Sequence, residues 1–454
     1  MADSMSLNLL SRILLLQLVL FSLLLQGCAT MAQKTANMRN QLASGNYQSA
    51  LADAKQALQN NPDGVMENMN LGLLYRLSQN YEASNQALEK AKQVIEKLYA
   101  TSVSEQTGAL LLNDELISYQ GDRYEQVLIH FYMALNYLEL NQLDAARVEL
   151  LQSQVKLNEW SEPKDDVPVM RYFSGILFEI LGEPDAATVS YRKAVDAYKN
   201  TQYRHGLSVP LQLKKDLLRS LSAMGMTDEL AIYKKQFNLP VPSASLFKTN
   251  AELILIIEKG LTPQREQIVF QTWSNELSSV IRVAVPGYPH PSPVLRPSRV
   301  QLADNVYTTE MASNIDGMAR SSLNENISAI TARAIARAVV KKQSERAMAE
   351  KSGSLGQIAL MAFNMGSEIA DTRCWNTLPQ QIEIMRVPLE PGKHMLKLQP
   401  YPSTGLAASI EIDVKPGERV IVNRRWTSSA GASQYENGRG HINIIPLFPL
   451  RIYR

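Results

Sequence analysis

The sequence predicts a multidomain fold, in which an all-α solenoid of helical repeats is followed by an α+β domain with a small antiparallel sheet or sandwich. Small residues recur at helical spacing over the first half of the chain, whereas short β-type runs separated by Pro-Gly turns fill its last quarter. Composition also changes at Pro240-Val241-Pro242. A chain of 454 residues is too long for one hydrophobic core. We expect a signal peptide at 1–27, a repeat domain at 28–245 and a C-terminal domain at 250–454.

Composition and charge exclude some classes of function. The net charge of +2 gives no electrostatic reason to expect nucleic-acid binding. The chain has two cysteines, Cys28 and Cys374, which cannot form a disulfide framework. We expect Cys374 to be buried as a small apolar residue.

The N-terminus has the pattern of a lipoprotein signal peptide. Residues 13–25 are a short apolar run after Arg12, and they end at Leu25-Gln26-Gly27-Cys28. A branched apolar residue, a small residue and then Cys predict that the Cys28 thiol takes a diacylglyceryl group. The alternatives are an ordinary signal peptide or a single anchor helix, since Gln26 departs from the pattern. Residues Ala29 and Thr30 lack the Asp that retains lipoproteins in the inner membrane, which favours the outer membrane.

Residues 32–242 show the period of about 34 residues that is typical of tetratricopeptide repeats. Each unit has two helices that cross at small residues, and we expect four units with a degenerate fifth at 211–237. Insertions at 94–124 and 160–169 interrupt the array. An unrelated helical bundle with alanine-rich faces is the alternative. The small residues at the expected crossings are Ala50, Ala54, Ala57, Gly72, Ala91, Ala134, Ala146, Gly175, Ala187 and Ala194.

Such a solenoid has a concave groove, lined by the first helix of each unit, that binds peptides or protein segments. Within the aromatic-rich segment 124–137, we expect His130, Tyr132 and Asn136 to share a helix face that lines the groove. They are candidate partner-binding residues. The alternative is that they pack inside the repeats.

The C-terminal domain combines strands with one long helix. A Pro-rich loop at 286–297 is followed by a helix at about 326–351, with a basic stripe of Arg333, Arg337, Lys341 and Lys342 that we expect to be solvated. Segment 354–370 is apolar, and it is either a core helix or an element that meets a membrane or partner. The expected strands are 252–257, 280–285, 382–387, 393–398, 408–414 and 419–425.

We find no motif of a known catalytic class, and the five histidines lack metal-ligand spacing. The SxxK pattern at Ser245–Lys248 lacks the other elements of penicillin-recognising enzymes. Two polar stretches could form a site where the domains meet, the alternative being inter-domain hydrogen bonds around a buried Trp. Their candidate residues are Tyr203, Arg204, Asp371, Arg373 and Trp375.

Two segments carry a resemblance to a known family. They are Gly121-Asp122-Arg123-Tyr124-Glu125 with the following HFYMALNYLELNQLDAARVE, and Ala370-Asp371-Thr372-Arg373 with Trp375 and Thr377-Leu378-Pro379. With the lipobox and the β-rich end, they resemble a poorly characterised family of tetratricopeptide-containing outer-membrane lipoproteins of Gram-negative bacteria. The resemblance implies an envelope location and an assembly or scaffolding role, without a defined activity.

The sequence therefore favours a non-enzymatic scaffold, without a cofactor, that is lipid-anchored to the outer membrane and faces the periplasm. Its groove would bind a protein partner from an assembly, export or peptidoglycan-synthesis machine of the envelope. The alternative is a glycan-binding or glycan-active envelope protein whose site lies in the C-terminal domain.

Overall fold

The computed structural model describes residues 31–100, 118–160, 162, 166–242, 251–367, 369–399, 408–427 and 442–447. The predicted signal peptide, Cys28 and the SxxK pattern at Ser245–Lys248 lie outside the described residues.

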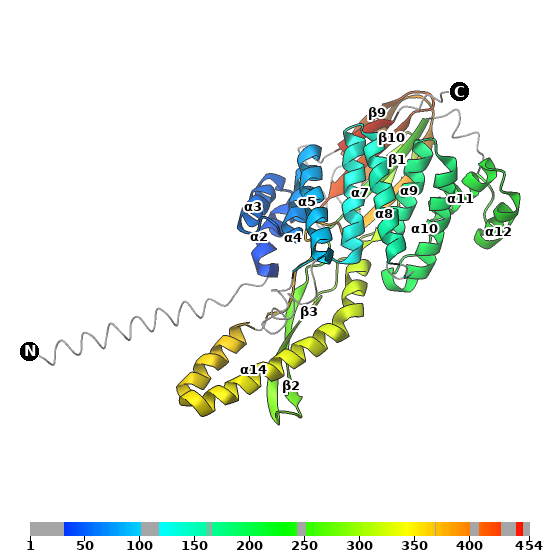
Figure 1. The fold of residues 1–454 in the computed structure, drawn as a ribbon. Coiled ribbons are helices and arrows are strands. Elements are labelled where there is room, and N and C mark those ends of the chain that lie inside the picture. The colour runs from blue at the N-terminus through cyan, green and yellow to red at the C-terminus, as the bar shows by residue number, and fades with distance from the viewer. Residues whose placement is uncertain are drawn as a thin grey trace, which may run out of the picture.

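The first half of the described chain is a stack of helical hairpins (Figure 1). Neighbouring helices pair as α2 with α3, α4 with α5, α7 with α8, α9 with α10 and α11 with α12. This arrangement confirms the predicted helical-repeat part. The helices are α2 (Met31–Ala43), α3 (Tyr47–Asn60), α4 (Val65–Leu77), α5 (Tyr81–Ala100), α7 (Arg123–Glu139), α8 (Leu143–Glu159), α9 (Pro168–Ile180), α10 (Pro184–His205), α11 (Leu211–Ala223) and α12 (Thr227–Phe237).

Local sequence explains where these helices begin and how closely they approach. Asp122 and Glu125 form a capping box at the start of α7, and Pro168 and Pro184 occupy the first positions of α9 and α10. At the α9–α10 crossing, a Cβ atom on Gly175 would lie 2.4 Å from the ring of Tyr191. The small residue is therefore required for the observed distance between the two helices.

Among the described residues, the β part consists of two larger sheets, A and C, and one separate two-stranded hairpin. Sheet A has the strand order β11-β10-β1-β7-β6, and sheet C has the order β5-β4-β8-β9. Sheet C is antiparallel, as predicted, whereas sheet A is mixed because β1 and β10 pair in parallel. Their strands are β1 (Ala251–Lys259), β4 (Arg299–Leu302), β5 (Asn305–Thr308), β6 (Glu310–Asn314), β7 (Gln381–Leu389), β8 (Gly392–Gln399), β9 (Ala408–Val414), β10 (Arg419–Trp426) and β11 (Ile442–Leu447).

Sheet A lies between two layers, the helical hairpins on one face and sheet C on the other. On β1, Ile254 and Ile256 join the core of the hairpins, whereas Leu253 and Leu255 join a second core shared with sheet C. Burial on both faces explains why the whole of β1 is apolar between its terminal charges. The repeat part and the sheet part therefore share one continuous core.

The remaining elements form a projection that we call the arm, comprising residues 266–287 and 326–350 (Figure 1, lower part). It contains the hairpin of β2 (Glu266–Ser274) and β3 (Ser279–Gly287), together with the middle part of α14 (Ile315–Ser367). The hairpin packs on α14 through Ile281, Val283, Ala334 and Ala338.

Helix α14 is longer than the predicted helix at 326–351, and it also includes most of the apolar segment 354–370. The expected solvated basic stripe needs correction, because Arg337 and Lys341 are buried while Arg333 is exposed. Within the described ranges, no helix is both long and apolar enough to span a bilayer.

Candidate functional site

The concave face of the helical hairpins is filled by the chain's own sheet A. Every residue of α4 except Tyr75, and every residue of α9 except Glu179, is buried. Bonds across the contact include Thr377 N–H to Asn70 (3.2 Å) and Arg76 to Asn423 (3.3 Å). The expectation of an open groove is therefore corrected, since sheet A already occupies it along α4, α7 and α9.

The three candidate groove residues accordingly contact the chain itself. Tyr132 donates its hydroxyl hydrogen to Glu258 on β1 (3.0 Å), and Asn136 accepts a hydrogen bond from Arg76 (2.7 Å). His130 faces α8, where its Nδ1 lies 2.6 Å from a carboxylate oxygen of Glu149. All three side chains are 1% exposed or less. They pack inside the molecule and do not offer a surface to a partner.

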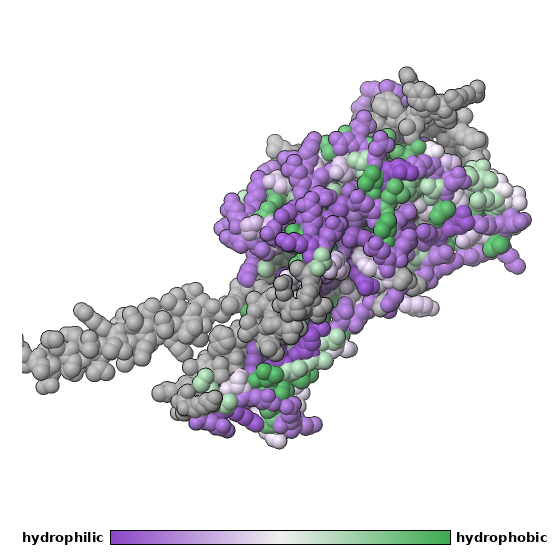
Figure 2. Space-filling view, viewed as in Figure 1, coloured by the Kyte–Doolittle hydropathy of each residue, from purple (hydrophilic) through white to green (hydrophobic). Residues whose placement is uncertain are grey.

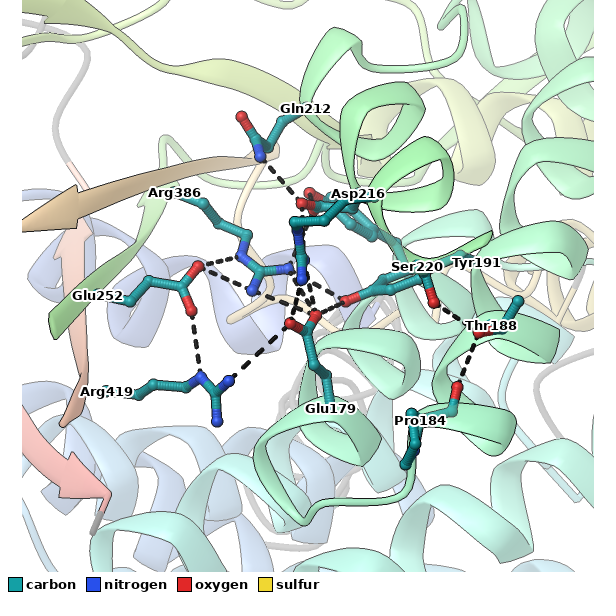
Figure 3. Close-up of polar contacts among 12 residues, drawn as sticks. Glu179, Pro184, Thr188, Tyr191, Gln212, Asp216, Ser220, Glu252, Arg386 and Arg419 are labelled. Carbon is teal, nitrogen blue, oxygen red and sulfur yellow. Dashed lines mark hydrogen bonds and ion pairs between the residues drawn. The ribbon is translucent and has the colours of Figure 1, made fainter. Parts of the chain in front are cut away.

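Buried charges join the hairpins to sheet A most densely around Arg386 (Figure 3). This arginine lies on β7 with a fully buried side chain. Its Nη1 donates to Asp216 of α11 (3.0 Å), and its Nε donates to Glu252 of β1 (2.8 Å). Glu179 of α9 lies 3.4 Å from Nη2. One guanidinium thus bridges two helices and a neighbouring strand.

Glu179 is shared among several cations. Arg219 pairs with it from α11, and Arg419 lies 4.0 Å away on β10. Burial alone raises the pKa of Glu179, but the guanidinium groups of Arg386 and Arg219 outweigh burial and hold that pKa far below its ordinary value. The carboxylate is therefore ionised throughout the physiological pH range.

A second buried acid, Glu125, lies at the other end of the contact between the helices and the sheet region. It accepts hydrogen bonds from the backbone N–H of Trp375 (2.7 Å) and from the Tyr119 hydroxyl (2.5 Å). Burial and the neighbouring Asp122 raise its pKa to about 7. Trp375 itself is 0% exposed, and its ring packs edge-on against that of Tyr132. The predicted buried Trp is therefore an interface residue between the helices and the sheet region.

The other predicted site residues lie in different surroundings. Asp371 and Arg373 pair with each other (2.8 Å), and Arg373 also lines a cavity of about 610 Å³ with Tyr119. Tyr203 is 99% exposed, whereas Arg204 pairs with Glu325 of α14. His205, next to Arg204, lines a separate cavity of about 330 Å³ together with Glu325. The two polar stretches thus contribute to different cavities.

Two neighbours of these residues have displaced pKa values. Burial, aided by Arg204, lowers the pKa of His205 to about 4. Burial raises the pKa of Cys374 to about 11, and this free thiol is 2% exposed, which confirms the prediction that it packs as an apolar residue. Among the described residues, no group of three or more His, Cys, Asp or Glu side chains could hold a metal ion.

The convex side of the hairpins carries an apolar stripe that we call the α8 stripe, comprising Val148, Leu151 and Val155. These residues share one face of α8 at intervals of three and four, and they are 47%, 38% and 55% exposed. Figure 2 shows apolar surface over the middle of the helical array, where α8 lies. Sequence reasoning missed this stripe because three apolar residues at that spacing normally face a core.

Comparisons with known proteins identify no family. No family model matches the sequence, and no curated protein matches it. Among solved structures, MamA aligns with 46% of this chain and 92% of its own, at 13% identity and a TM-score of 0.30. BtubC (BKLC) from P. vanneervenii aligns with 46% of this chain and 82% of its own, at 14% identity and a TM-score of 0.31. These partial similarities leave the function to be argued from the geometry.

Proposed function

We propose that the protein is a non-enzymatic, lipid-anchored scaffold of the outer membrane, which faces the periplasm and binds a protein partner of an envelope machine through its convex side. The observation that carries this proposal is the exposed α8 stripe on a helical array whose groove is already filled. The lipobox at Cys28 supports the anchor.

The α8 stripe fits the apolar face of a partner helix. Its residues repeat over two turns, which is the spacing at which two helices interlock. Each of the three side chains exposes apolar surface, and burying that surface against a partner contributes a binding free energy of about 25 cal/mol per Å². That gain alone supports only modest affinity. Anchoring both proteins at one membrane raises their effective concentration, so modest affinity is sufficient.

The test is crosslinking in intact cells followed by purification from detergent-solubilised envelope. We expect one stoichiometric protein partner for the native chain and its loss from a Leu151→Glu, Val155→Glu double variant. The matched control is Met395→Glu on β8, because Met395 is similarly exposed (45%) but lies on sheet C. Equal recovery of the partner with all three proteins would contradict the proposed surface.

The anchor is tested separately by labelling cells with radioactive palmitate. The native chain is expected to incorporate label and to fractionate with the outer membrane. A Cys28→Ala variant should lose both the label and the partner. An unlabelled native chain would remove the lipoprotein part of the proposal without affecting the α8 stripe.

A glycan-binding role is the second candidate, favoured by the cavity of about 610 Å³ beside Arg373 and Tyr119. Amide side chains of Asn61 and Gln93 also line it, and aromatic, amide and cationic groups together suit a sugar that carries an acidic substituent. Calorimetric titration with soluble peptidoglycan fragments tests this role. Saturable binding that Arg373→Ala abolishes would support it, and absence of heat with the native chain would end it.

A further inference from the structure

The arm exposes an unusual amount of apolar surface. The inner face of its hairpin packs on α14, but the outer face carries Trp273 (59% exposed), Val280 (50%) and Val269 (42%). Trp273 and Val280 are cross-strand partners, so they form one continuous patch. No other strand pairs with β2 or β3 among the described residues. An exposed Trp in such a patch marks a surface that meets another phase or molecule.

Helix α14 adds both apolar and basic groups to the arm. Val340 (46%) and Met348 (37%) are exposed on it. Arg333 is also exposed, as is Arg346, whose guanidinium holds the hairpin by donating to the Leu277 carbonyl (2.6 Å). Aromatic, aliphatic and arginine side chains together are the composition of elements that lie at the surface of a bilayer.

The base of the arm is bonded to the first turn of α2. Gln264, two residues before β2, donates to the Ala32 carbonyl (2.7 Å), and the Ala32 N–H donates to Thr372 (3.2 Å). Ala370, just beyond α14, donates its N–H to Gln267 on β2 (2.9 Å). The start of α2 therefore lies next to the two segments through which the chain enters and leaves the arm.

Covalent geometry then relates the arm to Cys28. Ala32 is the fourth residue after Cys28, so the two lie at most about 14 Å apart. Strand β2 carries Trp273 roughly 24 Å from the base of the arm, at about 3.4 Å per residue. In Figure 1 the arm projects from the end of the molecule at which α2 begins. A lipid on Cys28 would place the base of the arm within reach of the bilayer.

We infer that the arm lies against the membrane surface, with Trp273, Val269 and Val280 among the headgroups and with Arg282, which pairs with Gln271 on the same face of the hairpin, facing anionic phospholipid. This inference rests on the proposed lipidation of Cys28. The arm would orient the body on the membrane, because a lipid alone leaves an anchored domain free to rotate. Anionic lipid is the chosen occupant because arginine attracts it electrostatically.

The experiment uses the full acylated protein, reconstituted in vesicles of phosphatidylethanolamine and phosphatidylglycerol with brominated acyl chains. Bromine quenches tryptophan fluorescence only at close range. Trp375 and Trp426 are buried (0% and 3% exposed), so quenching of the native protein is expected to come from Trp273. We expect Trp273→Phe to reduce the quenching at least threefold and the matched Trp160→Phe variant to leave it nearly unchanged.

Flotation of the same vesicles distinguishes a failure of the arm inference from a failure of the proposed lipidation. Protein that floats with the vesicles but shows no Trp273-dependent quenching would overturn the arm inference and leave lipidation intact. Protein that does not float would overturn both. Replacing phosphatidylglycerol with phosphatidylcholine should weaken the quenching at least twofold, and equal quenching in the two lipids would remove the role assigned to Arg282.

Discussion

Arg386 carries a positive charge into an interface where Asp216, Glu179 and Glu252 converge. Removing one partner of a buried ion pair leaves uncompensated charge, which costs about 3–5 kcal/mol. We therefore expect Arg386→Met to lower the free energy of unfolding by that amount, measured by urea denaturation. Lys393→Met is the control, because the Lys393–Glu411 pair is 72% and 55% exposed and its loss should change little. Similar stabilities for the two variants would contradict the assigned role.

Glu125 predicts an unusual pH dependence of stability. Its pKa is about 7 in the folded protein against an ordinary value of 4.5, so the folded state holds the proton more tightly than the unfolded state. Stability should therefore fall as pH rises from about 4.5 to about 7, by on the order of 3 kcal/mol for this group. Denaturation of the native chain and Glu125→Gln across this window checks it. The variant should lose most of that slope, and parallel curves would contradict the assignment.

Cys374 should react slowly with thiol reagents. Its thiol is buried and its pKa is raised to about 11, so little thiolate is present or accessible at neutral pH. We expect iodoacetamide to modify Cys374 only after unfolding, as detected by mass spectrometry of its tryptic peptide. Rapid labelling of the folded protein would show that this part of the interface opens.

For single residues, the sequence predicts which side chains are buried better than it predicts which side chains they contact. The burial of Cys374 and the buried Trp375 both follow from ordinary residue preferences. The partners of Arg386 do not, because Glu179, Asp216 and Glu252 come from segments up to about 200 residues away. The sequence did indicate that such partners exist, because Glu252 and Glu258 flank an apolar run that is typical of a buried strand. Buried strands with terminal charges require ionic partners elsewhere.

Helix crossings give a prediction at the scale of elements. A Cβ on Gly175 would meet the ring of Tyr191, whose hydroxyl is fixed by Glu179 and Arg386. A Cβ on Gly72 would lie 2.6 Å from Cγ and Cδ2 of Leu88, an aliphatic side chain that can change rotamer. Replacing Gly by Ala favours a helix by about 1 kcal/mol, whereas overpacking costs about 1–3 kcal/mol. We therefore expect Gly175→Ala to lower the melting temperature and Gly72→Ala to change it less. The opposite order would show that Tyr191 moves freely.

Elements with a strong local pattern could be predicted, and those defined by their neighbours could not. The hairpin helices and the strands β1, β7, β8, β9 and β10 match periodic or β-type runs in the sequence. Strand β2 was missed because its apolar residues are half exposed, and β6 because it is short. The α8 stripe was missed for the opposite reason, since an apolar pattern identifies a face without showing whether anything covers it.

The arrangement of the whole molecule depends on contacts that no local pattern contains. Two separately stable domains follow naturally from the change in composition near Pro242. In the structure, however, one core includes Tyr132 and Phe173 of the helices with Ile256 and Ile384 of sheet A. Long-range pairing of this kind is fixed by shape and charge complementarity between elements. The groove was predicted to bind a separate protein partner, whereas in the structure sheet A of the same chain occupies it.

A shared core predicts cooperative unfolding of the repeat and sheet parts. Far-UV circular dichroism reports mainly the helices, whereas the buried Trp375 and Trp426 report the sheet region and its contact with the helices. We expect both signals of the full chain to change at one urea concentration, because separating the parts would expose α4, α7 and α9 together with the Arg386 cluster. Two separated transitions would show that each part is stable alone.

The same reasoning applies to a fragment that ends at Pro242. Without sheet A, the apolar residues of α4, α7 and α9 lose their cover, and Glu125, Glu179 and Asp216 lose partners from the sheet region. The fragment should keep helical secondary structure but lack fixed packing, so it should bind the dye ANS and show weak near-UV circular dichroism. A fragment with sharp unfolding and no dye binding would instead behave as an independent solenoid. Its groove would then be open, and sheet A would be a segment that competes with external partners for that groove.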